Sequence, residues 1–262
     1  MPIIFSALVP HPPLLIPAIG KENLNLLKAT SASYLELEQN LYVAQAETII
    51  IISPHGQPQA QAFTMNLSQQ FNGDFEEFGD LTTNFSLSGD IALAHKIKEK
   101  LETKVPLQLI SEAKLDHGAS IPLYLLTRHL PKIKIIPLYH SGLDLKAHFN
   151  FGQFIKNQLT SLPDRTAIIA SGDLSHRLSK NAPAGYSAKG KKFDKKLIDG
   201  LLAKRAEEII NLAPELAAEA GECGLKSIAI LLGALDGLKY EPKLLSYEAP
   251  FGVGYAAMYF RL

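Results

Sequence analysis

One short stretch constrains the fold more than any other part of the sequence. Four consecutive isoleucines, residues 49–52, precede Ser53, Pro54, His55 and Gly56. An uninterrupted apolar run of this kind is typical of a strand buried on both faces of a parallel sheet. Pro54 cannot donate to the hydrogen-bond ladder, so we expect the strand to end there. His55 then lies at the carboxyl end of a buried strand, where open α/β sheets bind their ligands.

Similar apolar runs alternate with segments that have helical spacing. The predicted buried strands cover residues 3–9, the isoleucine run 49–52, residues 132–138 and 166–170, and the longest predicted helices cover residues 21–45 and 145–162. This alternation predicts an α/β fold with a central, largely parallel or mixed sheet flanked by helices. No linker or repeat interrupts it, so we expect residues 1–262 to form one domain. Residues 68–80 are polar and acidic, which predicts a surface loop or hairpin.

Composition excludes several classes of protein. The formal net charge is zero, which argues against nucleic-acid binding. No apolar run approaches the ~20 residues that a membrane span needs, and the first nine residues lack the basic segment of a signal peptide. Cys223 is the single cysteine, so intramolecular disulfides and a cysteine-rich zinc site are excluded. We therefore expect a cytoplasmic protein, whose zero charge and 47% hydrophobic content are compatible with a homo-oligomer.

Histidines gather at the predicted strand ends. Four lie within a few residues of the carboxyl end of a predicted buried strand: His11, His55, His140 and His176. His117 lies in a loop that enters a helix, whereas His95, His129 and His148 lie in or beside helices. A single histidine is more often a hydrogen-bonded surface or core group than a ligand. If the strands are parallel, however, these imidazoles converge on one crevice, and several neutral imidazoles suit a divalent metal.

Two chemistries fit such a set of ligands. His11, His55 and one carboxylate would form a facial triad, which leaves open positions on iron(II) for substrate and dioxygen. The same ligands would form a catalytic zinc site with one open position. The residue types alone do not separate iron from zinc.

Four motifs carry a family resemblance. They occur in the order Val9-Pro10-His11-Pro12-Pro13, Ser53-Pro54-His55-Gly56, Leu115-Asp116-His117-Gly118 and Ser171-Gly172-Asp173-Leu174-Ser175-His176. This order resembles the class III extradiol ring-cleaving dioxygenases, the superfamily of the protocatechuate 4,5-dioxygenase catalytic subunit. Residues 222–224 and 246–255 look closest to its branch associated with AMMECR1 domains and related to Memo proteins.

The resemblance implies a site and an activity. In this superfamily two histidines and a glutamate hold non-haem iron(II), and His11 and His55 match the histidine ligands. Glu222 is the predicted glutamate, with Glu248 as the alternative. The implied activity is cleavage of a catechol-like or aminophenol-like ring with O2, with iron(II), or else zinc, as the metal.

Two further histidines receive roles from the same resemblance. His176 matches the acid/base histidine, and His117 matches the histidine beside the oxygen and substrate site. Histidine suits proton transfer because its ordinary pKa lies near neutrality. Asp173 is expected either to orient His176 or to hold the turn beside Gly172.

Cys223 carries the main alternative. Memo-like relatives place a cysteine at the metal site, and such a ligand set is softer and favours copper or zinc. The protein would then bind metal without cleaving a ring. The other interpretation of Cys223 is a small buried hydrophobic residue, which is the commonest environment of a free cysteine.

Overall fold

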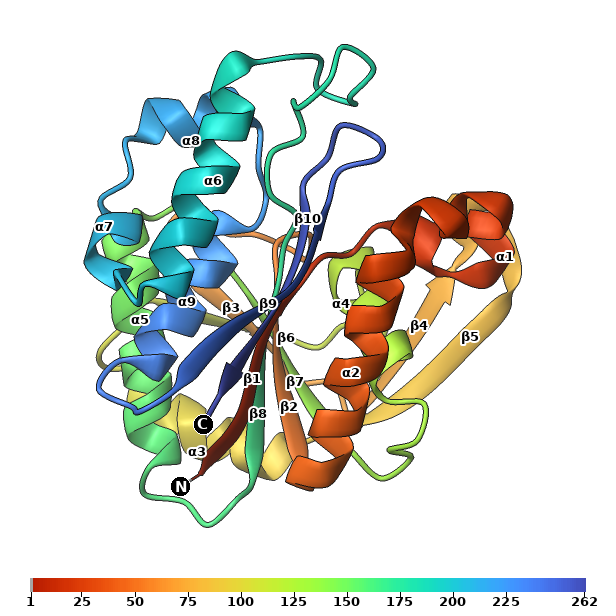
Figure 1. Ribbon diagram of the computed structural model, residues 1–262. Coiled ribbons are helices and arrows are strands. Elements are labelled where there is room, and N and C mark those ends of the chain that lie inside the picture. Colours follow the sequence, from red (N-terminus) through yellow and green to blue (C-terminus); the bar gives the residue numbers. More distant parts are fainter. Residues whose placement is uncertain (1) are drawn as a thin grey trace.

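A ten-stranded mixed sheet organises the protein, whose computed structural model describes residues 2–262 (Figure 1). The strand order along the main path is β4-β5-β7-β2-β8-β1-β10-β9, and β3 joins β7 and β6 off this path. The strands are β1 (Ile3–Val9), β2 (Thr48–Ser53), β3 (Phe63–Asn66), β4 (Gln70–Phe75), β5 (Asp80–Gly89), β6 (Leu107–Ile110), β7 (Lys134–Tyr139), β8 (Thr166–Ser171), β9 (Glu241–Glu248) and β10 (Tyr255–Arg261).

The centre of the sheet is parallel, as the sequence predicts. Strands β7, β2, β8 and β1 are adjacent and run in the same direction. Ile50 of β2 lies opposite Ile136 of β7 on one side and Ile168 of β8 on the other. Because parallel strands end at the same edge, the segments that follow β1, β2, β7 and β8 meet there.

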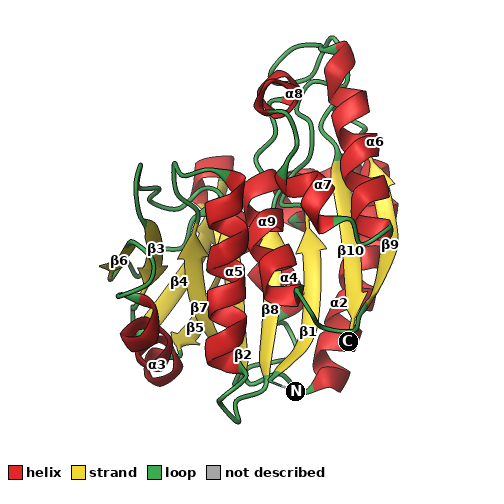
Figure 2. Cartoon of the chain, turned by 90° about the vertical axis from the view of Figure 1, so that its left-hand side faces the viewer, coloured by secondary structure: helices red, strands yellow, loops and turns green. Residues whose placement is uncertain are grey.

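Helices cover both faces of this sheet. α2 and α4 lie on one face and α5 and α9 on the other, which Figure 1 shows edge-on and Figure 2 from the side of α5 and α9. The α-helices are α1 (Pro17–Gly20), α2 (Lys28–Ala44), α3 (Ile91–Leu101), α4 (His117–Leu126), α5 (Leu145–Leu159), α6 (Ala188–Leu202), α7 (Ala206–Ile210), α8 (Pro214–Ala220) and α9 (Leu225–Leu235), and the short 3-10 helices are η1 (Pro13–Leu15), η2 (Lys21–Leu27) and η3 (Glu76–Phe78). Among residues 2–262, no helix combines the length and apolar character needed to cross a membrane.

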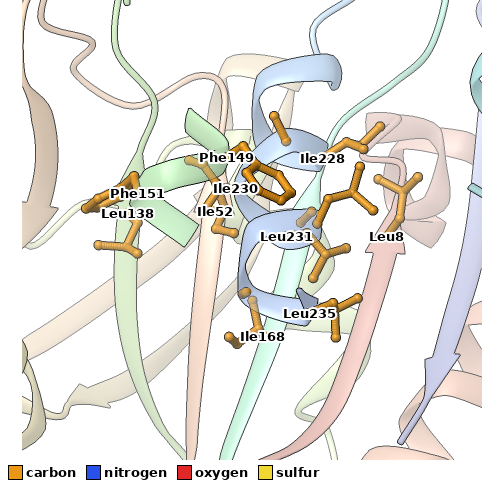
Figure 3. Packing of buried hydrophobic residues seen from close by; sticks show 14 of the residues in the cluster. Leu8, Ile52, Leu138, Phe149, Phe151, Ile168, Ile228, Ile230, Leu231 and Leu235 are labelled. Carbon is orange, nitrogen blue, oxygen red and sulfur yellow. The ribbon is translucent and has the colours of Figure 1, made fainter. Parts of the chain in front are cut away.

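The isoleucine run of β2 supplies both halves of the core. Ile50 and Ile52 pack into the cluster under α5 and α9, whereas Ile49 and Ile51 pack into the cluster under α2 and α4. Figure 3 shows the first cluster, in which Leu231 of α9 lies among side chains from several strands. All four isoleucines are at most 1% exposed, which explains why this strand carries no polar residue between its ends.

One predicted segment, the surface loop or hairpin at residues 68–80, is confirmed as a hairpin, and another segment differs in detail from the structure. Residues 68–80 hold strand β4 and the 3-10 helix η3, and β4 pairs antiparallel with β5 as a hairpin. His117, predicted to lie in a loop that enters a helix, is instead the first residue of α4, because the side chain of Asp116 accepts the Ala119 N–H and caps the first turn. His117 is therefore held at a helix start and not in a loop.

Candidate metal centre

His11 is fixed immediately beyond β1. Its side chain is only 3% exposed, and its backbone N–H donates to Asp173 Oδ1 at 2.9 Å. Its Nδ1 lies 2.8 Å from Ser171 Oγ, at the end of the neighbouring strand β8. Ser171 thus orients the imidazole, and Asp173, two residues further on, holds the backbone of His11.

The hydroxyl of Ser171 determines which nitrogen of His11 carries the proton. Ser171 Oγ donates its own hydrogen to the backbone oxygen of Gly118 at 2.5 Å. The hydroxyl can therefore only accept from His11, so Nδ1 is protonated and Nε2 presents a lone pair. Burial, and after it the neighbouring His117 and His176, keep the pKa of His11 well below its usual value, which favours this neutral form.

His55, just beyond the second strand of the same βαβ unit, faces that lone pair. The two Nε2 atoms are 3.0 Å apart, and the rings stand nearly perpendicular at a centroid distance of 4.8 Å. The His55 backbone N–H donates to Ser53 Oγ at 3.3 Å, which ties the residue to the end of β2. His55 is an exposed residue, yet desolvation of its ring and then the nearby imidazole of His11 lower its pKa to about 3, so both rings are neutral at pH 7.

Cys223 is the third potential ligand of this group. Its Sγ lies 3.7 Å from His11 Nε2, and one ligand atom from each of His11, His55 and Cys223 fits within 4.8 Å of the others. The segment is held against β8, since Gly224 N–H donates to Asp173 O at 3.0 Å and a Cβ on Gly172 would lie 2.2 Å from Gly224 Cα. Burial raises the pKa of the Cys223 thiol well above its usual value, an effect that a bound cation would reverse.

The two predicted carboxylate ligands lie elsewhere. Glu222 Oε2 accepts the Leu225 N–H at 2.6 Å at the start of α9, and its side chain lines a separate cavity with Lys226. Burial raises the pKa of Glu222 to about 7. Glu248 accepts the N–H and hydroxyl of Thr30, and so joins β9 to α2. Within residues 2–262 the structure groups Cys223, and neither Glu222 nor Glu248, with the two histidines.

His176 lies on the other side of the thiol. Its Nε2 is 3.8 Å from Cys223 Sγ and 3.9 Å from Asp173 Oδ2. The same carboxylate oxygen is 3.8 Å from His11 Nε2. Asp173 therefore faces both imidazoles as well as holding the His11 backbone, and burial raises its pKa to about 6. Asp173, His176 and Cys223 form a second group of potential ligands that shares the thiol with the first.

His117 stacks on His55 at the first turn of α4. Their ring centroids are 4.2 Å apart with an interplanar angle of 28°. The Nδ1 of His117 is 3.4 Å from Glu77 Oε1, and Phe78 packs edge-on against the ring. His117 and His55 both line a cleft of about 470 Å³, whose wall includes Tyr139. A volume of this size accommodates a small aromatic molecule.

The remaining histidines take no part in this group. His140 follows β7, and its Nδ1 is buried with no hydrogen-bond partner among residues 2–262. Burial lowers the pKa of His140 to about 4. His148 is buried and contacts the backbone of Ser141 and Asp144, and His129 pairs with Glu38. His95 lies on the exposed side of α3.

Sequence reasoning missed the role of three residues beside the site. Ser171 and Ser53 stand within the quoted motifs, and their position at the last residue of a strand is a usable signal. Nothing local marks Glu77, because it reaches His117 only through the β4–β5 hairpin.

Comparison with known proteins identifies the family. A model of the catalytic LigB subunit of aromatic ring-opening dioxygenase matches residues 6–258. The chain belongs to the LigB family. LigB enzymes typically use a metal, and the group of His11, His55 and Cys223 is a possible metal-binding site at the expected sheet edge.

Two individual proteins are similar to this LigB chain. Protein CA_C1420 of Clostridium acetobutylicum is 32% identical over 261 residues, which cover 96% of this chain and 56% of that protein. The chain thus spans little more than half the length of that relative. The crystal structure of uncharacterized protein JW3007 from Escherichia coli K12 has a TM-score of 0.70 at 16% identity, covering 98% of this chain and 99% of the other. This second similarity concerns the fold.

The donor set fits a metal ion. Two neutral imidazoles and a thiol converge, and the proton on His11 is held at the nitrogen that faces away from His55. Metal-binding histidines generally donate their other N–H to an oxygen in this way, which fixes the ring and strengthens the ligand. The three residues lie far apart in the sequence: His55 follows His11 by 44 positions, and Cys223 follows His55 by 168 positions.

Proposed function

We propose that this protein is a metal-dependent oxidoreductase that opens the ring of a catechol-like or aminophenol-like substrate with O2. We further propose that His11, His55 and Cys223 hold the metal. The observation that carries this proposal is the convergence of His11 Nε2, His55 Nε2 and Cys223 Sγ beside the aromatic-lined cleft. Membership of the LigB family supports a dioxygenase type of enzyme.

The proposed ligand set narrows the choice of metal. Two imidazoles and a thiolate are softer than two imidazoles and a carboxylate, and this favours copper or zinc. Iron(II) is the third candidate because the family resemblance implies it. A redox-active metal bound there would supply sites for both the substrate oxygens and dioxygen. The cleft beside His55 and His117 would orient the ring, with Tyr139 as part of its wall.

The protein's own proton-transfer groups lie within reach of the same point. We assign His176 as the general acid/base, since its Nε2 lies 3.8 Å from Cys223 Sγ and therefore borders the proposed metal position. Asp173, 3.9 Å from that nitrogen, would stabilise the imidazolium after His176 accepts a proton from a substrate hydroxyl. We assign His117, stacked on His55, to the substrate side of the cleft.

Metal analysis combined with oxygen uptake tests this proposal. The protein is loaded anaerobically with iron(II), its metal content is measured, and oxygen consumption is followed with a panel of catechols and aminophenols. We expect one equivalent of metal and substrate-dependent oxygen uptake. Cys223→Ala should lose the metal, whereas Glu222→Gln should keep it. If Cys223→Ala retained the metal and Glu222→Gln lost it, the third ligand would instead be the Glu222 carboxylate.

The cysteine itself favours a second candidate function. Facial triads of non-haem iron oxygenases use a carboxylate where this chain places a thiol beside two histidines. The alternative is a metal-binding protein that holds zinc, copper or iron without opening a ring. It predicts stoichiometric metal that depends on His11 and Cys223, together with no oxygen uptake on any member of the panel.

A further inference from the structure

The cleft beside the metal ligands carries an excess of negative charge. The described residues that line it include three carboxylates, those of Glu77, Glu112 and Asp116, and one cation, Lys114. The Lys114 ammonium is already neutralised, because it lies 2.9 Å from Asp74 Oδ2. The cleft therefore presents uncompensated carboxylates to whatever occupies it.

Two of these carboxylates are held at defined places. Asn66 accepts the backbone N–H of Glu112 at 3.0 Å and donates to its carbonyl at 2.9 Å, and Gln57 donates to Glu112 Oε1 at 3.2 Å. Glu77 Oε1 lies 3.4 Å from Nδ1 of His117, which itself stacks on His55. Glu112 and Glu77 thus line the same cleft as the imidazole beside which the substrate ring is expected to lie.

A third observation also points to a cationic ligand. The Oδ2 atom of Asp116 is buried and has no hydrogen-bond partner among the described residues, although its side chain lines the cleft. Its Oδ1 is already used by Ser53 and by the Ala119 N–H. This oxygen has almost no accessible surface, so a ligand in the cleft does not contact it. A positive charge on that ligand would still stabilise the carboxylate through space, whereas a negative charge would repel it.

We propose that the cleft selects aromatic substrates that bear an ammonium group and disfavours those that bear a carboxylate. The apolar and aromatic wall, with Ile110, Leu115 and Tyr139, would take the ring, and Glu112 and Glu77 would take the charged end of the side chain. This inference rests on the proposed function for its location. It adds the sign of the charge that the side chain of the substrate carries.

Two pairs of probes test the charge preference. Each pair shares its ring and has a side chain of similar length. The first pair, 2-phenylethylamine and 3-phenylpropanoate, has no catechol and is titrated into metal-free full-length protein by NMR. The second pair, 4-(2-aminoethyl)catechol and 3-(3,4-dihydroxyphenyl)propanoate, is titrated into metal-loaded protein by calorimetry. In both pairs we expect the amine to bind about 10-fold more tightly, since attraction and repulsion at exposed carboxylates each change affinity several-fold.

Matched variants assign the effect to the carboxylates. Glu112→Gln keeps an oxygen for Gln57 and removes only the charge, so the preference should fall by about 3-fold, and Glu77→Gln with Glu112→Gln should reduce it to about 2-fold or less. Glu99→Gln, on the exposed side of α3, is the control and should leave the preference unchanged. Higher ionic strength should weaken the preference as well.

The possible results separate this inference from the proposed function. An amine preference without oxygen uptake supports the charge selectivity and counts against ring opening. Oxygen uptake with equal binding of both members of each pair overturns the charge selectivity and leaves ring opening intact. A preference that survives in the double Glu→Gln variant also overturns the inference, because its source would then lie outside these two carboxylates.

Discussion

At the scale of single residues, the hydroxyl of Ser171 controls the chemistry of His11. It accepts from His11 Nδ1 because its hydrogen is donated to Gly118 O. Ser171→Ala removes this acceptor, so the ring can rotate and either nitrogen can be protonated. We expect metal affinity to fall by about 10- to 100-fold, as for other partners of metal-binding histidines, measured by competition with a chromophoric chelator.

Ser6→Ala is the matched control for that change. Ser6 is a fully buried serine in the adjacent strand β1, and its Oγ has no hydrogen-bond partner in the part of the chain that the structure describes. Removing it should leave metal affinity unchanged and stability equal or slightly greater, because no hydrogen bond is lost. An equal loss of affinity in both variants would contradict the role of Ser171 and indicate a general effect of cavities in these strands.

At the scale of secondary-structure elements, Asp194 joins α6 to two other segments. This residue is 1% exposed, and its carboxylate accepts the Ser175 N–H at 2.8 Å and the Tyr247 hydroxyl of β9 at 2.7 Å. Burial raises the pKa of Asp194 to about 6 despite these hydrogen bonds. Between about pH 4 and pH 6 the folded protein therefore binds more protons at this residue than the unfolded chain does, so its contribution to stability falls as pH rises.

Asp194→Asn should remove that pH dependence. The amide oxygen can still accept from Ser175, so at pH 4 the variant and the wild type should have similar free energies of unfolding. At pH 7 the variant should be the more stable by on the order of 2–3 kcal/mol, from a pKa difference of about two units. Urea unfolding of metal-free protein at the two pH values measures this difference.

The difference in free energy of unfolding between variant and wild type at one pH also cancels the contributions of other groups that titrate between pH 4 and pH 7. Asp173 acts in the same direction as Asp194, whereas His140 and His148, with pKa values lowered to about 4, lose stability as pH falls. A difference between variant and wild type that is the same at pH 4 and pH 7 would contradict the assignment to Asp194.

Burial on both faces or on one face of a strand explains which elements could be predicted from sequence. Strands β1, β2, β7 and β8 are buried on both faces, so each reads as an apolar run that needs no knowledge of its neighbours. The β4–β5 hairpin has Asn72 and Asp74 between Phe71 and Phe75 because only one of its faces is buried, and this weak alternation does not distinguish a hairpin from a loop. Register and hairpin pairing depend on contacts that composition does not encode.

The histidines of the candidate site could be predicted from sequence, but the choice of third ligand could not. His11 and His55 follow buried strands, and parallel strand order alone brings them to one edge. The choice between Glu222 and Cys223 depends instead on how the segment before α9 lies against β8. The close approach of Gly224 to Gly172 sets that direction, with Glu222 turned toward the start of α9. Such packing between distant segments cannot be predicted from the local spacing of residues.

At the scale of the whole molecule, a metal ion would cross-link the fold. The three proposed ligands follow β1, follow β2 and precede α9, so the unfolded chain does not present them together. A ligand that binds only the folded state stabilises it according to its affinity, by about 2.7 kcal/mol at a free concentration 100 times Kd. For a chain of this size we expect the midpoint of thermal unfolding to rise by about 5–10 °C with iron(II) or zinc.

The variants then identify which residues bind that metal in the folded state. The rise should disappear in His11→Ala and Cys223→Ala and persist in Glu222→Gln, because only the first two remove an atom of the convergent group. Magnesium is the control, since it prefers oxygen ligands and should leave the midpoint unchanged. A rise that persists in Cys223→Ala but disappears in Glu222→Gln would mean that the segment before α9 turns when metal binds. In that case the carboxylate would replace the thiol beside His11 and His55.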